Sequence, residues 1–153
     1  MFAPQVQCIF VKYADKILSW EMSTIGHPLS DLVNLTTPYH LQAASSGEFN
    51  TSSLKSPTGF APGATPSLPT QKQLIEWYSE VAGWDASLEL KWGIAFGFFR
   101  ATCIYQGIAA RYAVRQASSA QARENAEARH PMGALAWETV KEARDGSRDK
   151  SKL

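Results

Sequence analysis

Residues 17–32 read ILSWEMSTIGHPLSDL, and this stretch decides the fold expected for the chain. It begins with a short apolar run, passes through a turn that carries Trp20 and Glu21, breaks at a glycine and continues into a helix. Pro28 suits the first turn of that helix, because no N–H is needed there and the φ angle of proline is already helical. Apolar residues recur at helical spacing from Leu29 onward, so one face of the helix should be buried.

The run before the turn predicts a β-hairpin. Positions 8–13 and 17–20 are rich in β-branched and aromatic residues and lie on either side of a short link. Runs of this kind typically pair as antiparallel strands. Most later segments have the apolar spacing of helices, so the expected fold is α+β and mostly α.

The same stretch resembles the strand, turn and helix that follow the catalytic loop in aminoglycoside phosphotransferase-like (choline kinase-type) kinases. The branch fused to acyl-CoA dehydrogenases is the most similar, with its pattern Leu-Asp-Trp-Glu-Leu-Ser-Thr-x-Gly-x-Pro-Leu-x-Asp-Leu. The matching positions are Trp20-Glu21, Ser23-Thr24, Gly26, Pro28-Leu29 and Asp31-Leu32. The resemblance covers nearly the whole chain and implies the C-terminal helical lobe of a protein-kinase-like fold, with a short N-terminal β-hairpin.

One departure from that family concerns its metal site. The family has an Asp before the Trp, where it binds the Mg²⁺ that bridges the ATP phosphates, and this chain has Ser19. A neutral hydroxyl is a poor replacement, because a Mg²⁺ ion that faces phosphates needs anionic oxygen ligands. Glu21 matches the family and would point to the same side as Ser19 in an extended segment. It is either a remnant metal ligand or a solvated turn residue.

Other parts of the kinase machinery are absent from the sequence. The resemblance implies a His-Gly-Asp catalytic loop and a Gly-rich phosphate loop, and neither occurs in the 153 residues. We therefore expect a truncated, pseudokinase-like module without a catalytic residue of its own, with Mg and ATP as cofactors only if some activity survives. The alternative is part of an ATP-dependent small-molecule kinase that acts on hydroxyacyl-CoA-like substrates.

Two more residues are candidates for the site. The resemblance implies that Asp31 holds the backbone of the catalytic loop, and an interaction with the helix dipole is the other interpretation. Arg100 lies in a long apolar helix expected over residues 92–114 and could bind an anionic substrate group. An internal pair with a carboxylate is the favoured interpretation, because a buried charge needs a partner. A central Arg is also costly in lipid, so this helix should be buried on most sides in a helical lobe and should not span a membrane.

The remaining elements follow from local signals. Residues 41–69 are rich in Ser, Thr, Gly and Pro and predict a long loop, either a lid in the substrate region or an insertion, which Phe49 and Phe60 could anchor. Thr70 opens a helix with a capping box, and Gly83 ends that helix.

Further signals mark the later helices. Asp85 should cap the long helix, in which Gly93, Gly97 and Gly107 would allow close helix contacts. A last helix opens at Pro131 and should fade at residue 146.

Composition and the C-terminal residues bear on partners and location. The net charge of +1 gives no reason to expect a nucleic-acid partner. The sequence ends in Ser151, Lys152 and Leu153, a peroxisomal targeting tripeptide. We expect residues 1–145 to form the partial lobe and residues 146–153 to form a flexible tail. The peroxisomal import receptor would bind this tail, so the expected location of the protein is the peroxisome. Apolar surface left exposed on a partial lobe predicts self-association or a protein partner.

Overall fold

The computed structural model describes residues 26–45, 54 and 57–150, with side chains described up to residue 146. It contains the helices α1 (Leu29–Ser45), α2 (Gln71–Ala82), α3 (Leu90–Ala113), α4 (Ala122–Glu127) and α5 (Arg129–Lys150), and the 3-10 turns η2 (Thr58–Phe60) and η3 (Ala86–Leu88). This described part contains no strand, so the expectation of a mostly helical protein is confirmed. The expected hairpin over residues 8–20 lies outside it.

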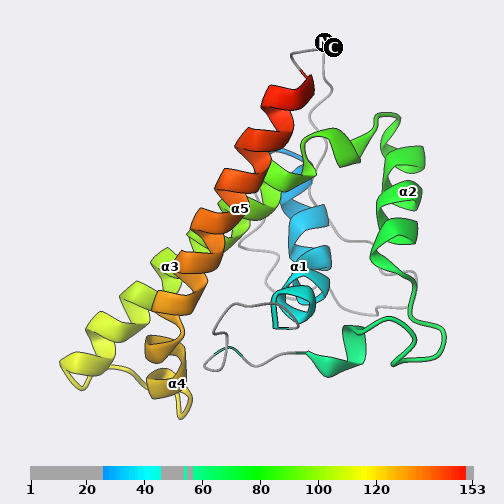
Figure 1. Ribbon diagram of the computed structural model, residues 1–153. Coiled ribbons are helices and arrows are strands. Elements are labelled where there is room, and N and C mark those ends of the chain that lie inside the picture. Colours follow the sequence, from blue (N-terminus) through cyan, green and yellow to red (C-terminus); the bar gives the residue numbers. More distant parts are fainter. Residues whose placement is uncertain (1–25, 46–53, 55–56, 151–153) are drawn as a thin grey trace.

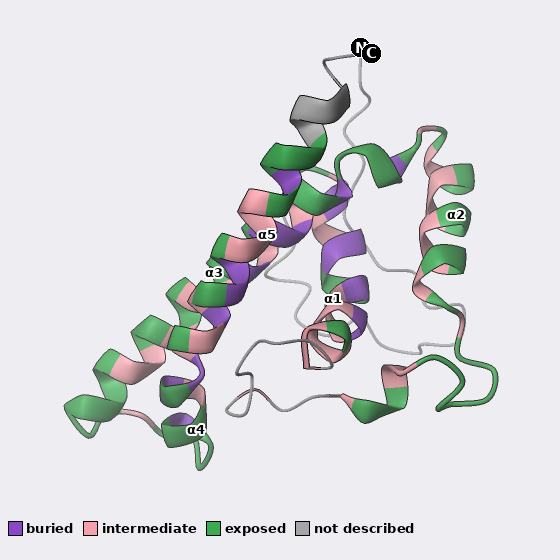
Figure 2. Ribbon diagram, in the orientation of Figure 1, coloured by how far each residue is buried: buried purple, intermediate pink, exposed green. Residues whose placement is uncertain are grey.

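Helices α3 and α5 form a long antiparallel pair on one side of the molecule, with α4 at one end of the pair (Figure 1). Helix α1 packs beside α3, and α2 lies on the far side of α1. Most of the buried core residues lie where α1, α3 and α5 face one another, and a few further buried residues lie on α4 and in η3 (Figure 2). This core contains Leu29, Leu32, Val33, Leu90, Ile94, Phe98, Met132 and Leu135.

Two glycines set the distance between α1 and α3. A Cβ atom at Gly97 would lie 2.6 Å from Val33 Cγ1, and one at Gly93 would lie 2.9 Å from Val33 Cγ2. Both positions are therefore occupied by the one residue that lets the two helices approach so closely. Gly107 does not have this role, because a Cβ there would have nothing within 4 Å.

Helix α3 is half exposed, so the expectation that it would be buried on most sides was wrong. Leu90, Ile94, Ala95 and Phe98 are its buried residues. Helices α1, α4 and α5 all pack against α3, but several of its large apolar side chains still face solvent. The large exposed ones are Trp92, Phe96, Phe99, Ile104 and Tyr112. Over the described residues, no helix has both the length and the apolar character needed to cross a membrane, in agreement with the expectation.

Two expected boundaries were also wrong. The loop expected from residue 41 begins later, because α1 continues through Pro38 to Ser45 and packs Leu41 and Ala44 against the core. The last helix does not fade at Gly146, since the backbone remains helical to Lys150. One glycine costs a helix only about 1 kcal/mol, and the buried Ala143 holds α5 against its neighbours just before it. Residues 146–150 are thus helix, where a flexible tail was expected.

The local signals around α2 are confirmed. Thr70 and Gln73 form the capping box, and Gly83 ends the helix with a φ of 74°. The expectation that Asp85 would cap the long helix was wrong. Its Oδ1 accepts a hydrogen bond from the Ser87 N–H at 2.9 Å and so caps the 3-10 turn before α3, whereas α3 itself begins after Glu89 without a side-chain cap.

The segment before α2 is tied to α1 by aromatic side chains. Phe60 packs edge-to-face on Tyr39, with ring centroids 5.0 Å apart. The Tyr39 hydroxyl donates a hydrogen bond to the Pro69 carbonyl at 2.6 Å. Phe60 is thus an anchor of the loop as expected, whereas Phe49 lies outside the described residues.

Candidate functional site

A groove of about 650 Å³ opens between the first turns of α1 and the first half of α3. Its base is formed where Val33 meets Gly93 and Gly97, and the rings of Trp92 and Phe96 form apolar walls. A groove of this volume suits a small-molecule ligand. Its polar residues are His27, Ser30, Glu89 and Arg100.

His27 and Glu89 form one end of the groove. His27 Nδ1 accepts a hydrogen bond from the Leu29 N–H at 3.3 Å, so His27 caps the start of α1. The other ring nitrogen, Nε2, therefore carries the proton of the neutral ring and lies 3.8 Å from Glu89 Oε2. Trp84 holds the ring from the side, with centroids 6.4 Å apart. The pair is exposed, and at this distance it orients the two side chains more than it stabilises the fold.

Arg100 forms another part of the groove, one helical turn beyond Phe96 and two beyond Trp92. Its guanidinium donates a hydrogen bond to Asn34 Oδ1 on α1. The favoured interpretation, a buried pair with a carboxylate, was wrong, because the side chain is exposed and water can solvate its charge. Among the described residues no carboxylate forms an ion pair with it. A guanidinium has five N–H donors, so this one bond leaves others for an anionic group in the groove.

Asp31 lies outside the groove, at the contact between α1 and α2. Burial raises the pKa of its carboxyl. Burial and then the nearby charge of Asp31 raise the pKa of Tyr78, whose hydroxyl donates to the Pro28 carbonyl at 2.8 Å. Asp31 is thus a partly buried residue in the first turn of α1, and the role implied by the family resemblance stays a prediction.

The metal position and the targeting tripeptide lie outside the described residues. This applies to Ser19 and Glu21 and to Ser151, Lys152 and Leu153. Elsewhere, within the part of the chain that the structure describes, no three His, Cys, Asp or Glu side chains gather closely enough to hold a metal ion.

Comparison with known proteins gives partial matches. Acyl-CoA dehydrogenase family member 10 from Mus musculus is 31% identical over 124 residues, which are 80% of this chain and 11% of that protein. Acyl-CoA dehydrogenase family member 11 from Rattus norvegicus is 33% identical over 105 residues, 67% of this chain and 12% of that protein. The Gallus gallus member 11 is 29% identical over 126 residues, 82% of this chain and 15% of that protein.

These proteins are homologues of the chain. The chain spans only 11% to 15% of the length of the family members 10 and 11 given above. Their name fits the expected link with acyl-CoA metabolism. No family model matches the sequence, and no solved structure matches it.

Sequence reasoning identified Arg100 but missed the groove that it lines. Trp92, Phe96 and Arg100 stand at intervals of four residues, which is a signal that they share one face of a helix. Nothing in the sequence showed that Asn34, 66 residues earlier, would meet that face. The groove depends on the packing of α1 on α3, and local patterns do not specify that packing.

Proposed function

We propose that this chain carries a kinase-like phosphotransferase segment that has no kinase activity on its own. The observation that carries the proposal is Ser19, which stands in the position of the metal-binding Asp within a stretch that otherwise follows the family pattern. Phosphoryl transfer depends on metal ions that neutralise charge on the phosphates, and a neutral hydroxyl cannot supply the anionic ligand. The similarity to acyl-CoA dehydrogenase family members supports the proposal, since the resemblance is strongest to the branch fused to such enzymes.

A second candidate is a contribution to an ATP-dependent kinase for hydroxyacyl-CoA-like substrates. The groove favours it, because Arg100 offers N–H donors to an anionic group while Trp92 and Phe96 offer apolar contact to an acyl chain. In this case Glu21 would keep a share of the metal site, and ATP with Mg would be the phosphoryl donor.

Thermal unfolding with and without Mg·ATP distinguishes the two functions. A ligand that binds the native state at 100 times its Kd adds about 2.7 kcal/mol to stability, and so raises Tm by several degrees. If the segment has no kinase activity, Tm should show no Mg-dependent rise at millimolar Mg·ATP. A rise that disappears in Glu21→Gln would show that Mg·ATP binds through Glu21 and would favour the second candidate instead. Ser19→Asp is the matched variant, and a rise seen only with it would assign the loss of binding to this position.

We further propose that Ser151, Lys152 and Leu153 direct the protein to peroxisomes through the import receptor. The receptor requires a free C-terminal tripeptide, so a fluorescent tag is placed at the N-terminus. Removal of Leu153 should leave the tagged protein in the cytosol, while the intact chain colocalises with a peroxisomal marker. Import that is unchanged by the deletion would overturn this part of the proposal.

A further inference from the structure

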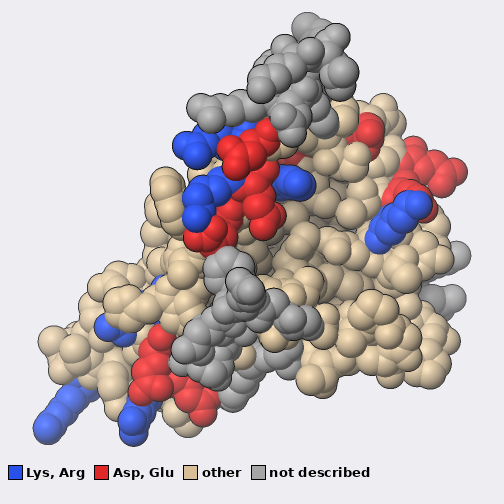
Figure 3. Space-filling view, viewed as in Figure 1, with Lys and Arg blue, Asp and Glu red and all other residues tan. Residues whose placement is uncertain are grey.

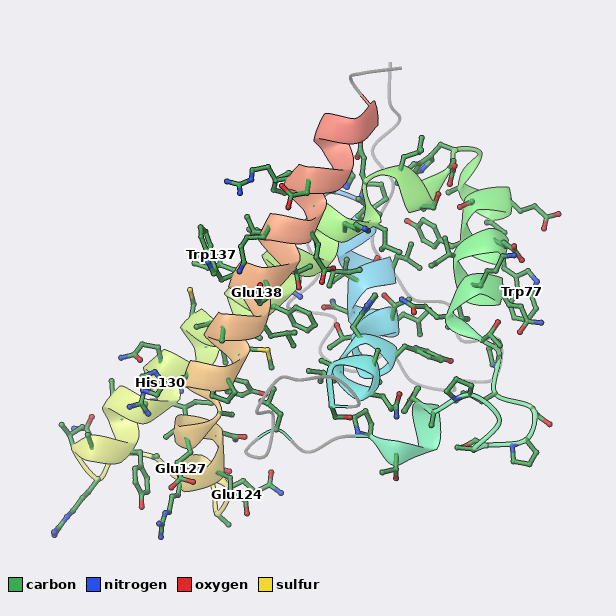
Figure 4. The ribbon with its side chains drawn as sticks, in the orientation of Figure 1. Trp77, Glu124, Glu127, His130, Trp137 and Glu138 are labelled. Atoms are coloured by element: carbon green, nitrogen blue, oxygen red, sulfur yellow. The ribbon has the colours of Figure 1, made fainter. Side chains whose placement is uncertain are left out.

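One apolar surface lies outside the polar end of the groove, on the outer side of the α3 and α5 pair. We call it the α3–α5 patch and define it by Trp92, Phe96, Phe99, Trp137 and Val140. These side chains border a hollow of about 360 Å³, and none of the nine described residues that line it is charged. Trp137 points outward from α5 (Figure 4). The four aromatic residues are between 46% and 61% exposed.

The exposed area of the patch is large enough for an interface. A large aromatic side chain has on the order of 200 Å² of surface, so the four rings leave roughly 450 Å² in contact with water. A single patch of about 300–600 Å² is the largest found on a typical monomer and is often functional. Two such patches face to face would bury roughly 900 Å² from the rings alone. The surrounding side chains would bring the total above the approximately 1,000 Å² of a specific interface.

The shape of the patch indicates which partner it would fit. Protruding rings and a hollow occur on the same face, so two copies related by a two-fold axis can each place a ring in the hollow of the other. Acidic and basic side chains are mixed along α5 beside this largely uncharged region (Figure 3), with Lys141 paired to Glu138. A helix that binds an anionic membrane has a mainly basic rim, which this mixture does not provide.

We propose that the α3–α5 patch is the contact face of a symmetric dimer of this chain. The proposal does not require kinase activity, but Trp92 and Phe96 line both the patch and the groove of Arg100. Trp137 and Val140 are patch residues that do not line the groove of Arg100. Substitutions at these two positions therefore test the dimer without changing the lining of the groove.

Sedimentation velocity of the full chain from 1 to 300 µM tests the dimer. The intact chain should shift from monomer to dimer within this range, and Trp137→Ala should raise the dimer Kd at least tenfold. Trp77→Ala is the matched control, since Trp77 is 54% exposed against 59% for Trp137 but points outward from α2 on the other side of the molecule (Figure 4). It should change the Kd less than twofold. Unchanged far-UV circular dichroism shows that both variants are folded.

Three results would overturn the proposal. The first is a chain that stays monomeric throughout this concentration range. The second is a dimer that Trp77→Ala weakens as much as Trp137→Ala does. The third is a monomer that binds phosphatidylcholine vesicles, with a blue shift of tryptophan emission that Trp137→Ala reduces, because the occupant of the patch would then be a lipid surface.

Discussion

His40 is held in its neutral form inside the α1–α2 contact. Burial lowers the pKa of its imidazole from 6.5 to about 4. The amide nitrogen of Gln71 lies 2.6 Å from His40 Nε2. An amide N–H can only donate, so Nε2 must accept and the ring must be unprotonated at this nitrogen. Protonation of the ring would place a charge in a buried site and would also break this hydrogen bond.

We predict that the free energy of unfolding falls as the pH is lowered from about 6.5 to about 4. In this window the unfolded chain binds a proton on His40 that the folded chain does not bind, so acid favours unfolding. Over the whole window the loss is on the order of 2 to 3 kcal/mol, and above about pH 7 His40 contributes no pH dependence. Urea unfolding at a series of pH values measures the slope.

One variant isolates the contribution of His40. His40→Gln keeps a hydrogen-bonding side chain without a titrating ring and should flatten the slope. The raised pKa of Asp31 acts in the opposite direction near the acid end, because there the folded chain binds the proton more tightly. Equal slopes for the intact chain and His40→Gln would show that His40 is accessible to protons in the folded protein.

The packing of α3 on α1 predicts opposite effects for the same substitution at two glycines. Gly97→Ala places a methyl group 2.6 Å from Val33 Cγ1 and should destabilise the protein by about 1 to 3 kcal/mol. Gly107→Ala meets nothing within 4 Å and should stabilise it by about 0.5 to 1 kcal/mol, because alanine has less backbone freedom to lose in a helix. Chemical denaturation of the two variants gives both values.

A third variant tests the cause of the effect at Gly97. Val33→Ala combined with Gly97→Ala removes the methyl group that the new Cβ meets, so the double variant should lose less than the sum of the two single losses. Simple additivity, or a Gly97→Ala variant as stable as Gly107→Ala, would contradict the close approach of α1 and α3.

The elements that could be predicted from sequence are those with local causes. Thr70 and Gly83 bound α2 as expected, since a capping side chain and a left-handed φ are set by a few neighbouring residues. The composition of residues 41–69 suggested a loop from residue 41, but packing of Leu41 and Ala44 on the core outweighed that preference. In the same way, the apolar composition of α3 did not show which neighbours would cover it.

The candidate site was predictable only in part, for a related reason. Arg100 was recognised as a charge in an apolar helix, yet its partner is Asn34. The groove and the α3–α5 patch both arise from pairs of helices that are distant in the sequence. The apolar residues that line them follow the pattern of a buried helix, and only the arrangement of the helices in space determines which of these residues are buried and which are exposed.

The molecule as a whole is unevenly stabilised, and α2 is its least secured helix. Helices α1, α3 and α5 share the buried core, whereas α2 contains no buried residue. It is attached through its partly buried side chains, the hydrogen bond between Gln71 and His40, and the hydrogen bond from Tyr78 to the Pro28 carbonyl. We predict that the amides of α2 exchange with solvent through local opening, at a lower free energy than those in the centre of α3 and α5.

Tyr78→Phe should widen the gap between the free energy of opening of α2 and that of α3 and α5. It removes the hydroxyl that joins α2 to the start of α1, at a cost of about 1 kcal/mol, so exchange in α2 should be roughly fivefold faster. Amides in the middle of α5 should lose protection only to the extent that the global stability falls. They stay protected when α2 opens alone, so the loss of the Tyr78 hydrogen bond does not affect them directly. Hydrogen exchange read by mass spectrometry, peptide by peptide, separates the two cases. An equal loss of protection in α2 and α5 would show that the helices open as one unit and that α2 is part of the cooperative core.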